Sequence, residues 1–242
     1  MSDEQILLMA SAASIGVVHT LIGPDHYLPF ITLARTRRWS LLRTVGVTLA
    51  SGLGHVAGSV LLGALGISLG WALGGLERLE AFRSEMAGWI LFAFGLAYLS
   101  WGLRQAYRSR PHSHVHTHAD GIVHEHGHAH NREHAHVHHP PEADSRKMLR
   151  GATAWTLFLV FVLGPCEPLI PLLMYPAATG SATGVAIVAA VFALATLATM
   201  TTVVIVGRAS LDLLPTGRWE RWSHAVAGAI VAACGLGIQL GL

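Results

Sequence analysis

The sequence is poor in charged residues and in cysteine. Asp, Glu, Lys and Arg make up 12% of the 242 residues, whereas soluble domains carry about 25%. The two cysteines do not form a CxxC pair, which argues against a disulfide framework or a zinc ribbon. No basic stretch precedes the first apolar run, so we expect no cleavable signal peptide. The scarcity of charge excludes an ordinary soluble enzyme.

Long apolar runs take the place of the missing charge. Hydrophobic residues make up 52% of the chain, and its mean hydropathy is +0.49. A run of about 20 apolar residues is long enough to cross a bilayer as a helix. We therefore predict an all-α polytopic membrane protein with six transmembrane helices, at 6–34, 41–69, 86–107, 151–174, 182–206 and 222–240.

The basic residues are distributed unevenly between the predicted loops. Fourteen of the sixteen Lys and Arg residues fall on one side, and Arg78 and Arg83 are the exceptions. Cytoplasmic loops carry the excess of Lys and Arg in membrane proteins. We expect a multi-pass protein of the inner (plasma) membrane, with both termini outside and the loop 108–150 in the cytoplasm.

Two short segments suggest an internal repeat. Gly23-Pro24-Asp25-His26 in the first span matches Gly164-Pro165-Cys166-Glu167 in the fourth, so helices 1 and 4 are both expected to break at Gly-Pro. Three spans per half would place the second half upside down relative to the first, as in many transporters. We predict two inverted three-helix repeats, 1–107 and 151–242, joined by the segment 108–150. The breaks could alternatively be packing kinks.

Three histidines and an aspartate lie within the apolar spans of the first half. His19 and His26 are seven residues apart, about two helical turns, and Asp25 adjoins His26. His55 lies among small residues in the second span, which permits close helix approach. Imidazole is a good ligand for Ni, Co, Cu and Zn. These four residues are candidate metal ligands, although they could instead hydrogen-bond one another as structural contacts.

Cys166 and Glu167 are the corresponding candidates in the second half. Glu167 could balance the charge of a divalent ion or take up protons. It could also be a protonated acid bonded to carbonyl groups freed by nearby prolines. Cys166 is either a soft metal ligand or a small apolar side chain.

The segment between the two halves is rich in histidine. It has no apolar periodicity, so we expect disorder without metal. A free histidine has a pKa of about 6.5, so most of these rings would be neutral at cytoplasmic pH and able to bind metal. A pH-sensing or purely solvating linker is the other interpretation. The metal-capturing candidates are His112, His114, His116, His118, His124, His126, His128, His130, His134, His136, His138 and His139.

Several of these motifs together resemble the nickel/cobalt transporter superfamily. The stretch His19–His26, the Ser-Gly-Leu-Gly-His sequence ending at His55, the Leu-Gly-Pro-Cys-Glu-Pro of span four and the histidine-rich loop carry the likeness. It is strongest to the six-span, UreH-like branch. The resemblance implies passage of Ni²⁺ or Co²⁺ with His19, Asp25, His26 and His55 at the motif positions, and Zn²⁺ is a further candidate for the loop.

The segment 164–168 is also similar to the Pro-Cys segment of CcdA-like membrane thiol carriers. Thiol exchange requires two cysteines that meet. The position matching Cys166 in the first half is Asp25, and Cys234 lies in span six, so the sequence disfavours a thiol-redox carrier.

We expect a nickel or cobalt transporter of undetermined direction rather than an enzyme, with no catalytic cofactor. A membrane-anchored metal-loading or storage protein for a nickel enzyme such as urease is the main rival. The expected partners are metal ions, the lipid bilayer and metalloenzyme maturation proteins, not nucleic acid.

Overall fold

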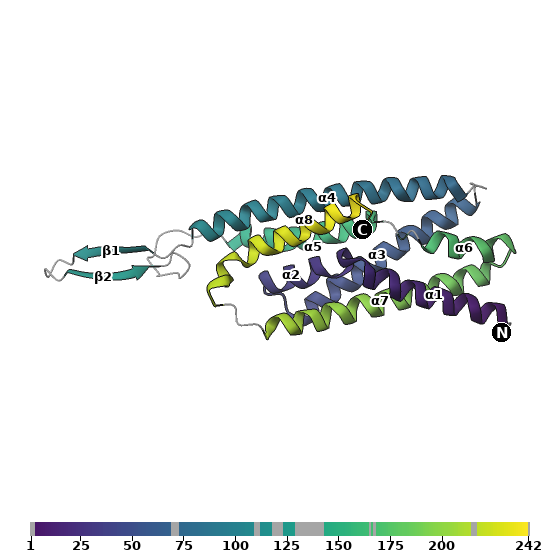
Figure 1. Cartoon of the computed structure of the whole chain (residues 1–242), viewed down its shortest axis with the longest axis horizontal. Helices are drawn as coiled ribbons and strands as arrows, with labels where there is room; N and C mark the ends of the chain where they lie inside the picture. The colour runs from purple at the N-terminus through teal and green to yellow at the C-terminus, as the bar shows by residue number, and fades with distance from the viewer. Residues whose placement is uncertain are drawn as a thin grey trace.

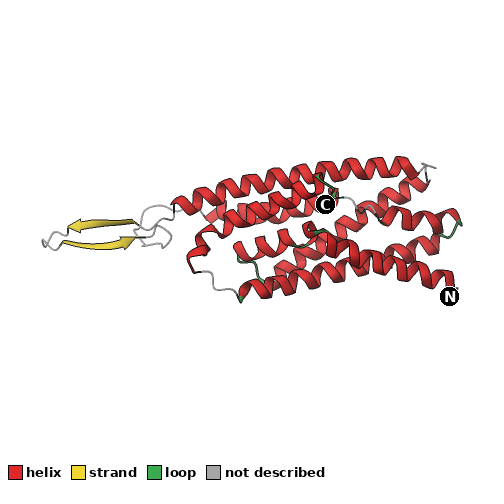
Figure 2. Cartoon of the chain, in the orientation of Figure 1, coloured by secondary structure: helices red, strands yellow, loops and turns green. Residues whose placement is uncertain are grey.

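The computed structural model is a helical bundle with a two-stranded hairpin at one end (Figures 1 and 2). It describes residues 3–68, 73–108, 112–117, 123–128, 143–164, 166, 168–213 and 217–241. The longer helices are α1 (Asp3–Ile22), α3 (Leu41–Ser68), α4 (Leu73–Arg108), α5 (Ala143–Leu163), α7 (Ala182–Asp212) and α8 (Ser223–Gln239). The shorter elements are the 3₁₀ turns η1 (Pro24–His26) and η2 (Gly217–Trp222), helices α2 (Leu28–Thr36) and α6 (Leu169–Ala178), and strands β1 (His112–Thr117) and β2 (Val123–His128).

Five of the described helices are long and apolar enough to cross a membrane. They lie at Asp3–Ile22, Leu41–Gly66, Gly75–Arg108, Ala182–Asp212 and Glu220–Gln239. Large apolar side chains on their outer surfaces, such as Leu42 and Leu61, are exposed as lipid contact requires. The chain is therefore a multi-pass membrane protein.

The first predicted span is broken where the sequence places Gly23-Pro24. Helix α1 ends at Ile22, the 3₁₀ turn η1 follows, and α2 begins at Leu28. Proline has no N–H to continue the helical ladder, and the Gly23 N–H closes α1 on the His19 carbonyl at 3.1 Å. The fourth predicted span is also interrupted, between the end of α5 at Leu163 and the start of α6 at Leu169.

The principal contacts join helices of the first half to helices of the second. Helix α1 packs on α7, α3 packs on α5, and α4 packs on α8, while α2 lies against both α7 and α8. The broken segment of the first span consequently lies inside the bundle rather than at its edge (Figure 1). Two clusters of buried apolar side chains, one around Phe30 and Phe161 and one around Phe192 and Leu169, flank it.

Helices α4 and α8 approach each other through glycines at heptad spacing. A Cβ added at Gly95 would lie 2.2 Å from the Ala232 backbone nitrogen, and one at Gly102 would lie 2.4 Å from that of Ala225. Gly228 and Gly235 of α8 meet the α4 backbone just as closely. Small residues at such contacts let membrane helices pack backbone to backbone.

We predict that Gly95→Ala destabilises the protein by about 1–3 kcal/mol, because the added methyl overpacks a contact between two backbones. In an unconstrained helix the same change stabilises by up to about 1 kcal/mol. Gly75→Ala, also in α4, meets nothing within 4 Å and is the matched control. Detergent-induced unfolding of the two variants measures the difference. Equal stabilities would show that the close α4–α8 contact is not a constraint.

The third predicted span is longer than the sequence indicates. It was predicted to begin at residue 86, but α4 begins at Leu73. Arg78 and Arg83 therefore lie in a helix rather than in a loop. The Arg83 side chain is only 15% exposed and pairs with Glu80, which explains how an apolar environment accepts the two charges.

Part of the histidine-rich segment forms paired strands rather than the disorder expected there. Residues 112–117 and 123–128 pair as an antiparallel hairpin of β1 and β2 (Figure 2), and the prediction for the rest of residues 112–139 lies outside the described residues. Histidine alternates with other residues at a period of two, which is the side-chain period of a strand. That alternation lets a segment without a helical apolar pattern form a hairpin.

Candidate metal centre

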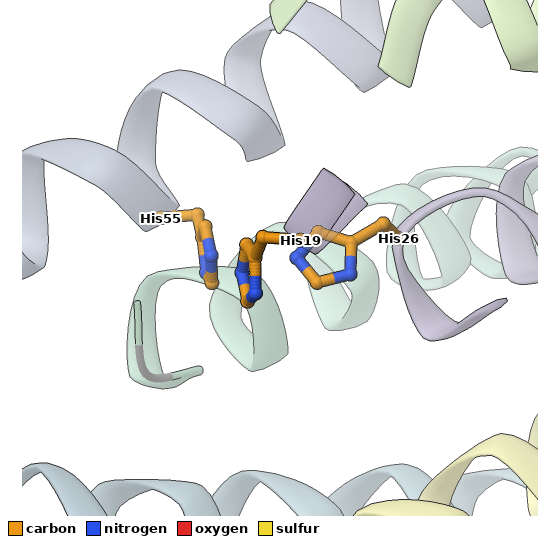
Figure 3. Close-up of side chains that lie close together, drawn as sticks. All are labelled: His19, His26 and His55. Atoms are coloured by element: carbon orange, nitrogen blue, oxygen red, sulfur yellow. The ribbon is translucent and has the colours of Figure 1, made fainter. Parts of the chain in front are cut away.

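Three histidines converge inside the bundle, two from the broken first span and one from the next helix. His19 lies in the last turn of α1, His26 ends η1, and His55 lies in the middle of α3. The His19 and His26 rings are 4.7 Å apart, those of His26 and His55 are 5.2 Å apart, and those of His19 and His55 are 6.3 Å apart, centroid to centroid. Figure 3 shows the three rings side by side. The break after Ile22 returns the chain so that His26 faces His19.

The surroundings of His26 determine which of its nitrogens is free. Its Nδ1 lies 3.2 Å from the Gly23 carbonyl oxygen and 3.3 Å from Asp25 Oδ1. A carbonyl oxygen only accepts hydrogen bonds, so Nδ1 carries the proton and donates it. In the neutral ring, Nε2 then keeps its lone pair for a ligand. A metal-binding histidine usually donates its other nitrogen to a carboxylate or carbonyl in this way.

His55 is oriented by the second half of the chain. Its Nδ1 lies 3.3 Å from the carbonyl oxygen of Phe161, which belongs to the last turn of α5. That carbonyl also only accepts, so Nε2 is again the unprotonated nitrogen. The side chain is 4% exposed, and Gly164 leaves room for its ring: a Cβ there would lie 3.3 Å from Nδ1.

The Nε2 atoms of His19, His26 and His55 are all buried without a hydrogen-bond partner. A buried polar atom left unpaired costs about 1–3 kcal/mol, and three at one point are costly unless something binds them. One ring nitrogen from each histidine lies within 4.8 Å of the others. The site therefore offers three ring nitrogens to a transition metal, and the Nδ1 contacts of His26 and His55 leave Nε2 of those two rings available to it.

The separation of these nitrogens suits one ion after a small closure. A tetrahedral ion with metal–nitrogen bonds of about 2.1 Å places its ligands about 3.4 Å apart. Each ring needs to move by less than about 1 Å to reach that arrangement from a spacing of 4.8 Å. Three protein ligands leave the fourth position of a tetrahedral site open, as in catalytic zinc centres.

Asp25 lies beside the three histidines, in contact with His26. Its carboxylate contacts the back of His26, while the group of mutually close ligand atoms comprises the three histidines. We expected Asp25 to bind metal directly with them. In the structure it orients His26 and would offset part of the charge of a bound cation.

The segment after α5 is held by a buried ion pair that the sequence did not reveal. Arg83 Nη1 lies 2.6 Å from Glu80 Oε1, and Arg83 Nη2 donates to the Val162 carbonyl at 2.9 Å and to the Gly164 carbonyl at 3.4 Å. Ser59 Oγ accepts from the Cys166 N–H at 3.2 Å. Arg83 thus satisfies carbonyl groups next to Phe161, whose own carbonyl orients His55. The spacing of Glu80 and Arg83, an acid and a base three residues apart, was the sequence signal that could have revealed this ion pair.

The other predicted ligands stand apart from this group or outside the described residues. Cys166 is fully buried near Val56 and Phe192 and is not one of the mutually close ligand atoms. Cys234 is a separate free cysteine in the other apolar cluster. Glu167 lies outside the described residues, as do the loop histidines His118, His130, His134, His136, His138 and His139.

The described part of the loop pairs histidine with histidine across the hairpin. In the backbone register His112 is opposite His128, His114 is opposite His126, and His116 is opposite His124. Residues two apart in a strand lie on the same face, so these six positions share one face of the hairpin. Metal capture by the loop stays a prediction.

Comparison with known proteins identifies a family. The family model described as "Cytochrome C biogenesis protein transmembrane region" matches residues 27–237. No curated protein and no solved structure matches the chain.

This match corrects the resemblance drawn from short motifs. The assignment to the nickel/cobalt transporter superfamily and its UreH-like branch was wrong. The predicted transport of nickel or cobalt was therefore wrong too, as was the rival role of loading or storing metal for a nickel enzyme. The match spans most of the chain, whereas the motifs that suggested the transporter are a few residues each. The thiol-redox class, which the cysteine positions disfavoured, is the class that the family supports.

Proposed function

Because the chain belongs to the family of cytochrome c biogenesis protein transmembrane regions, we propose that it is a membrane protein of thiol-redox chemistry built around a bound transition-metal ion. His19, His26 and His55 would hold the ion. Two observations carry the proposal: one ring nitrogen of each histidine lies within 4.8 Å of the others, and all three Nε2 atoms are buried without a hydrogen-bond partner.

The positions of the cysteines favour a bound metal ion over a cysteine pair as the group that reacts with thiols. Internal thiol exchange needs two cysteines whose Cα atoms come within about 7 Å. Cys166 and Cys234 belong to different apolar clusters, and Asp25 stands where the first repeat would need the second thiol. A bound metal ion would bind thiolates and act as a Lewis acid.

The chain's own residues would prepare the site for the ion. Asp25 and the Gly23 and Phe161 carbonyls fix the tautomers of His26 and His55, and the surrounding apolar clusters exclude water. The donor set of neutral imidazoles suits Cu, Zn, Ni and Co alike. The identity of the ion is therefore a question for titration.

We further propose that the fold consists of six spans arranged as two inverted three-helix repeats, 1–107 and 151–242. In such a repeat the helices α1 to α4 correspond in order to α5 to α8. The α1–α7 contact then corresponds to the α5–α3 contact, and the α4–α8 contact corresponds to itself. This correspondence supports the repeat. The excess of Lys and Arg in the loops on one side supports an inner-membrane orientation with both termini outside and residues 108–150 in the cytoplasm.

Cobalt titration tests the metal centre directly. Co²⁺ in a tetrahedral site has intense visible absorption bands, which report its binding. We expect the purified protein to bind one such ion per chain. The twelve loop histidines are replaced by serine in this full-length protein, which removes competing sites. We expect Cys166→Ser and Cys234→Ser together to leave the Co²⁺ affinity within about twofold, because neither thiol belongs to the group. Absence of tetrahedral Co²⁺ would refute the proposed centre.

A cellular experiment tests the thiol-redox role. Loss of the protein should lower the amount of haem-stained cytochrome c in membranes. The double cysteine variant should restore it, and a variant of the histidine site should not. The reverse pattern, with the cysteines required and the histidines dispensable, would assign the chemistry to the thiols alone.

Asp25→Asn should weaken metal binding without abolishing it. The amide keeps the shape but loses the charge that favours the Nδ1 proton of His26, and loss of such outer partners costs about 10–100-fold in metal affinity. Competition with a chromophoric chelator measures the change. The control is Asp212→Asn in α7, because Asp212 pairs with Arg208 away from the site. Equal affinities of the Asp25→Asn variant and the parent would mean that Asp25 does not act on the centre.

A further inference from the structure

A cavity of about 520 Å³ adjoins the three histidines. His19, His26 and His55 all line it, together with Asp25. Its volume is in the range of sites that take small molecules, about 300–1,000 Å³. An open fourth position on a bound ion would face a space large enough for a ligand from outside the chain.

The residues that line the cavity show in which direction it extends along the bundle. Ser84 lies in the N-terminal third of α4, Ile238 lies in the last turn of α8, and Gly241 follows that helix. Arg108, at the other end of α4, and Arg221, before α8 begins, mark the basic end of the bundle. The cavity therefore extends from the histidines toward the end of the bundle away from the basic loops.

The charges at the site limit the fourth ligand. A divalent ion with three neutral imidazoles and the Asp25 carboxylate carries a net charge of +1. An uncompensated charge inside the membrane is costly, and one singly charged anionic ligand would cancel it. Apart from the histidines, Asp25 is the one ionisable side chain among the described lining residues.

The remaining lining limits the body of the ligand. Val18, Ile22, Leu91 and Ile238 give the cavity apolar walls, and no described cation there could pair with a second anionic group. A soft anionic donor on an aliphatic body fits these conditions, and thiolates bind the metals that imidazole also suits.

We infer that the cavity admits an aliphatic thiol, which binds the metal ion as a thiolate in the fourth position. The inference rests on the proposed metal centre. When the thiol replaces a bound water, the metal–oxygen bond and the S–H bond break, a metal–sulfur bond forms, and the water leaves with the proton as H₃O⁺. No electron is transferred in this step.

The test uses the full-length chain with the loop histidines and both cysteines replaced by serine, loaded with Co²⁺. Added 1-butanethiol should produce a near-ultraviolet sulfur-to-cobalt charge-transfer band, and 1-butanol should not. The affinity for 2-mercaptoethanesulfonate should be at least about tenfold weaker, because its sulfonate has no partner in apolar surroundings. Ser84→Trp should weaken butanethiol binding by a similar factor, whereas Ser100→Trp, on the exposed surface of α4, should not.

Tetrahedral Co²⁺ bands without a charge-transfer band on addition of butanethiol would overturn this inference and leave the metal centre standing. Preferential binding of the sulfonate thiol would overturn the apolar character of the ligand. Absence of the Co²⁺ bands themselves would instead refute the centre on which the inference rests.

Discussion

His26→Ala should abolish tetrahedral Co²⁺ binding by the membrane part of the protein. The change removes the ring that is nearest to both of the others, at 4.7 Å from His19 and 5.2 Å from His55, and it also takes the His26 contact away from Asp25. The loss of affinity should exceed the roughly 10–100-fold effect of a second-sphere change, because a donor bond itself is lost. Visible absorption of the Co²⁺-loaded protein without loop histidines measures the result.

His224→Ala is the matched control for that variant. His224 is a partly buried histidine at the start of α8, where its Nδ1 lies 2.9 Å from the Tyr98 hydroxyl, and it is not one of the three convergent rings. It should keep the Co²⁺ bands. If His26→Ala kept them too, the ion would not be bound by the three histidines.

Arg83→Met should be the most destabilising single change considered, at about 3–5 kcal/mol, the usual cost of removing one partner of a buried ion pair. Glu80, only 1% exposed, would lose its partner 2.6 Å away. The Val162 and Gly164 carbonyls would lose a donor as well. Unfolding in mixed detergent micelles measures the change.

Two further variants give this prediction its control and its test. Arg78→Met removes an exposed arginine of the same helix and should alter stability by less than about 0.5 kcal/mol. Adding Glu80→Met to Arg83→Met should recover much of the loss, because the buried carboxylate that Arg83 no longer neutralises is removed. Equal stability of the Arg83 and Arg78 variants would show that the pair does not stabilise the broken segment.

Much of the membrane architecture could be predicted from the sequence. Apolar runs identify membrane helices because bilayer thickness sets their length, and Gly23-Pro24 predicts a break because proline cannot donate to the helical ladder. The start of α4 could not be predicted, because Arg83 and Glu80 look like loop residues until each is seen to neutralise the other. The paired strands were likewise hidden, since strand pairing depends on a partner segment.

The family assignment shows a different limit. Short motifs around His26 and Cys166 predicted the wrong superfamily, because each is only a few residues long and draws on a small part of the chain. A match over residues 27–237 draws on the whole apolar pattern and is far more specific.

The stretch from His19 to His26 could be singled out from sequence alone, because histidine and aspartate in an apolar run need partners to offset their desolvation. The sequence could also offer His55 as a third imidazole. Only the tertiary structure decided that the three rings meet, that Asp25 lies behind His26, and that the Phe161 carbonyl orients His55. Those facts depend on the packing of α3 against α5 and on the bend after Ile22. The sequence predicts the bend, but the packing of α3 against α5 joins residues distant in the chain, which local residue patterns do not encode.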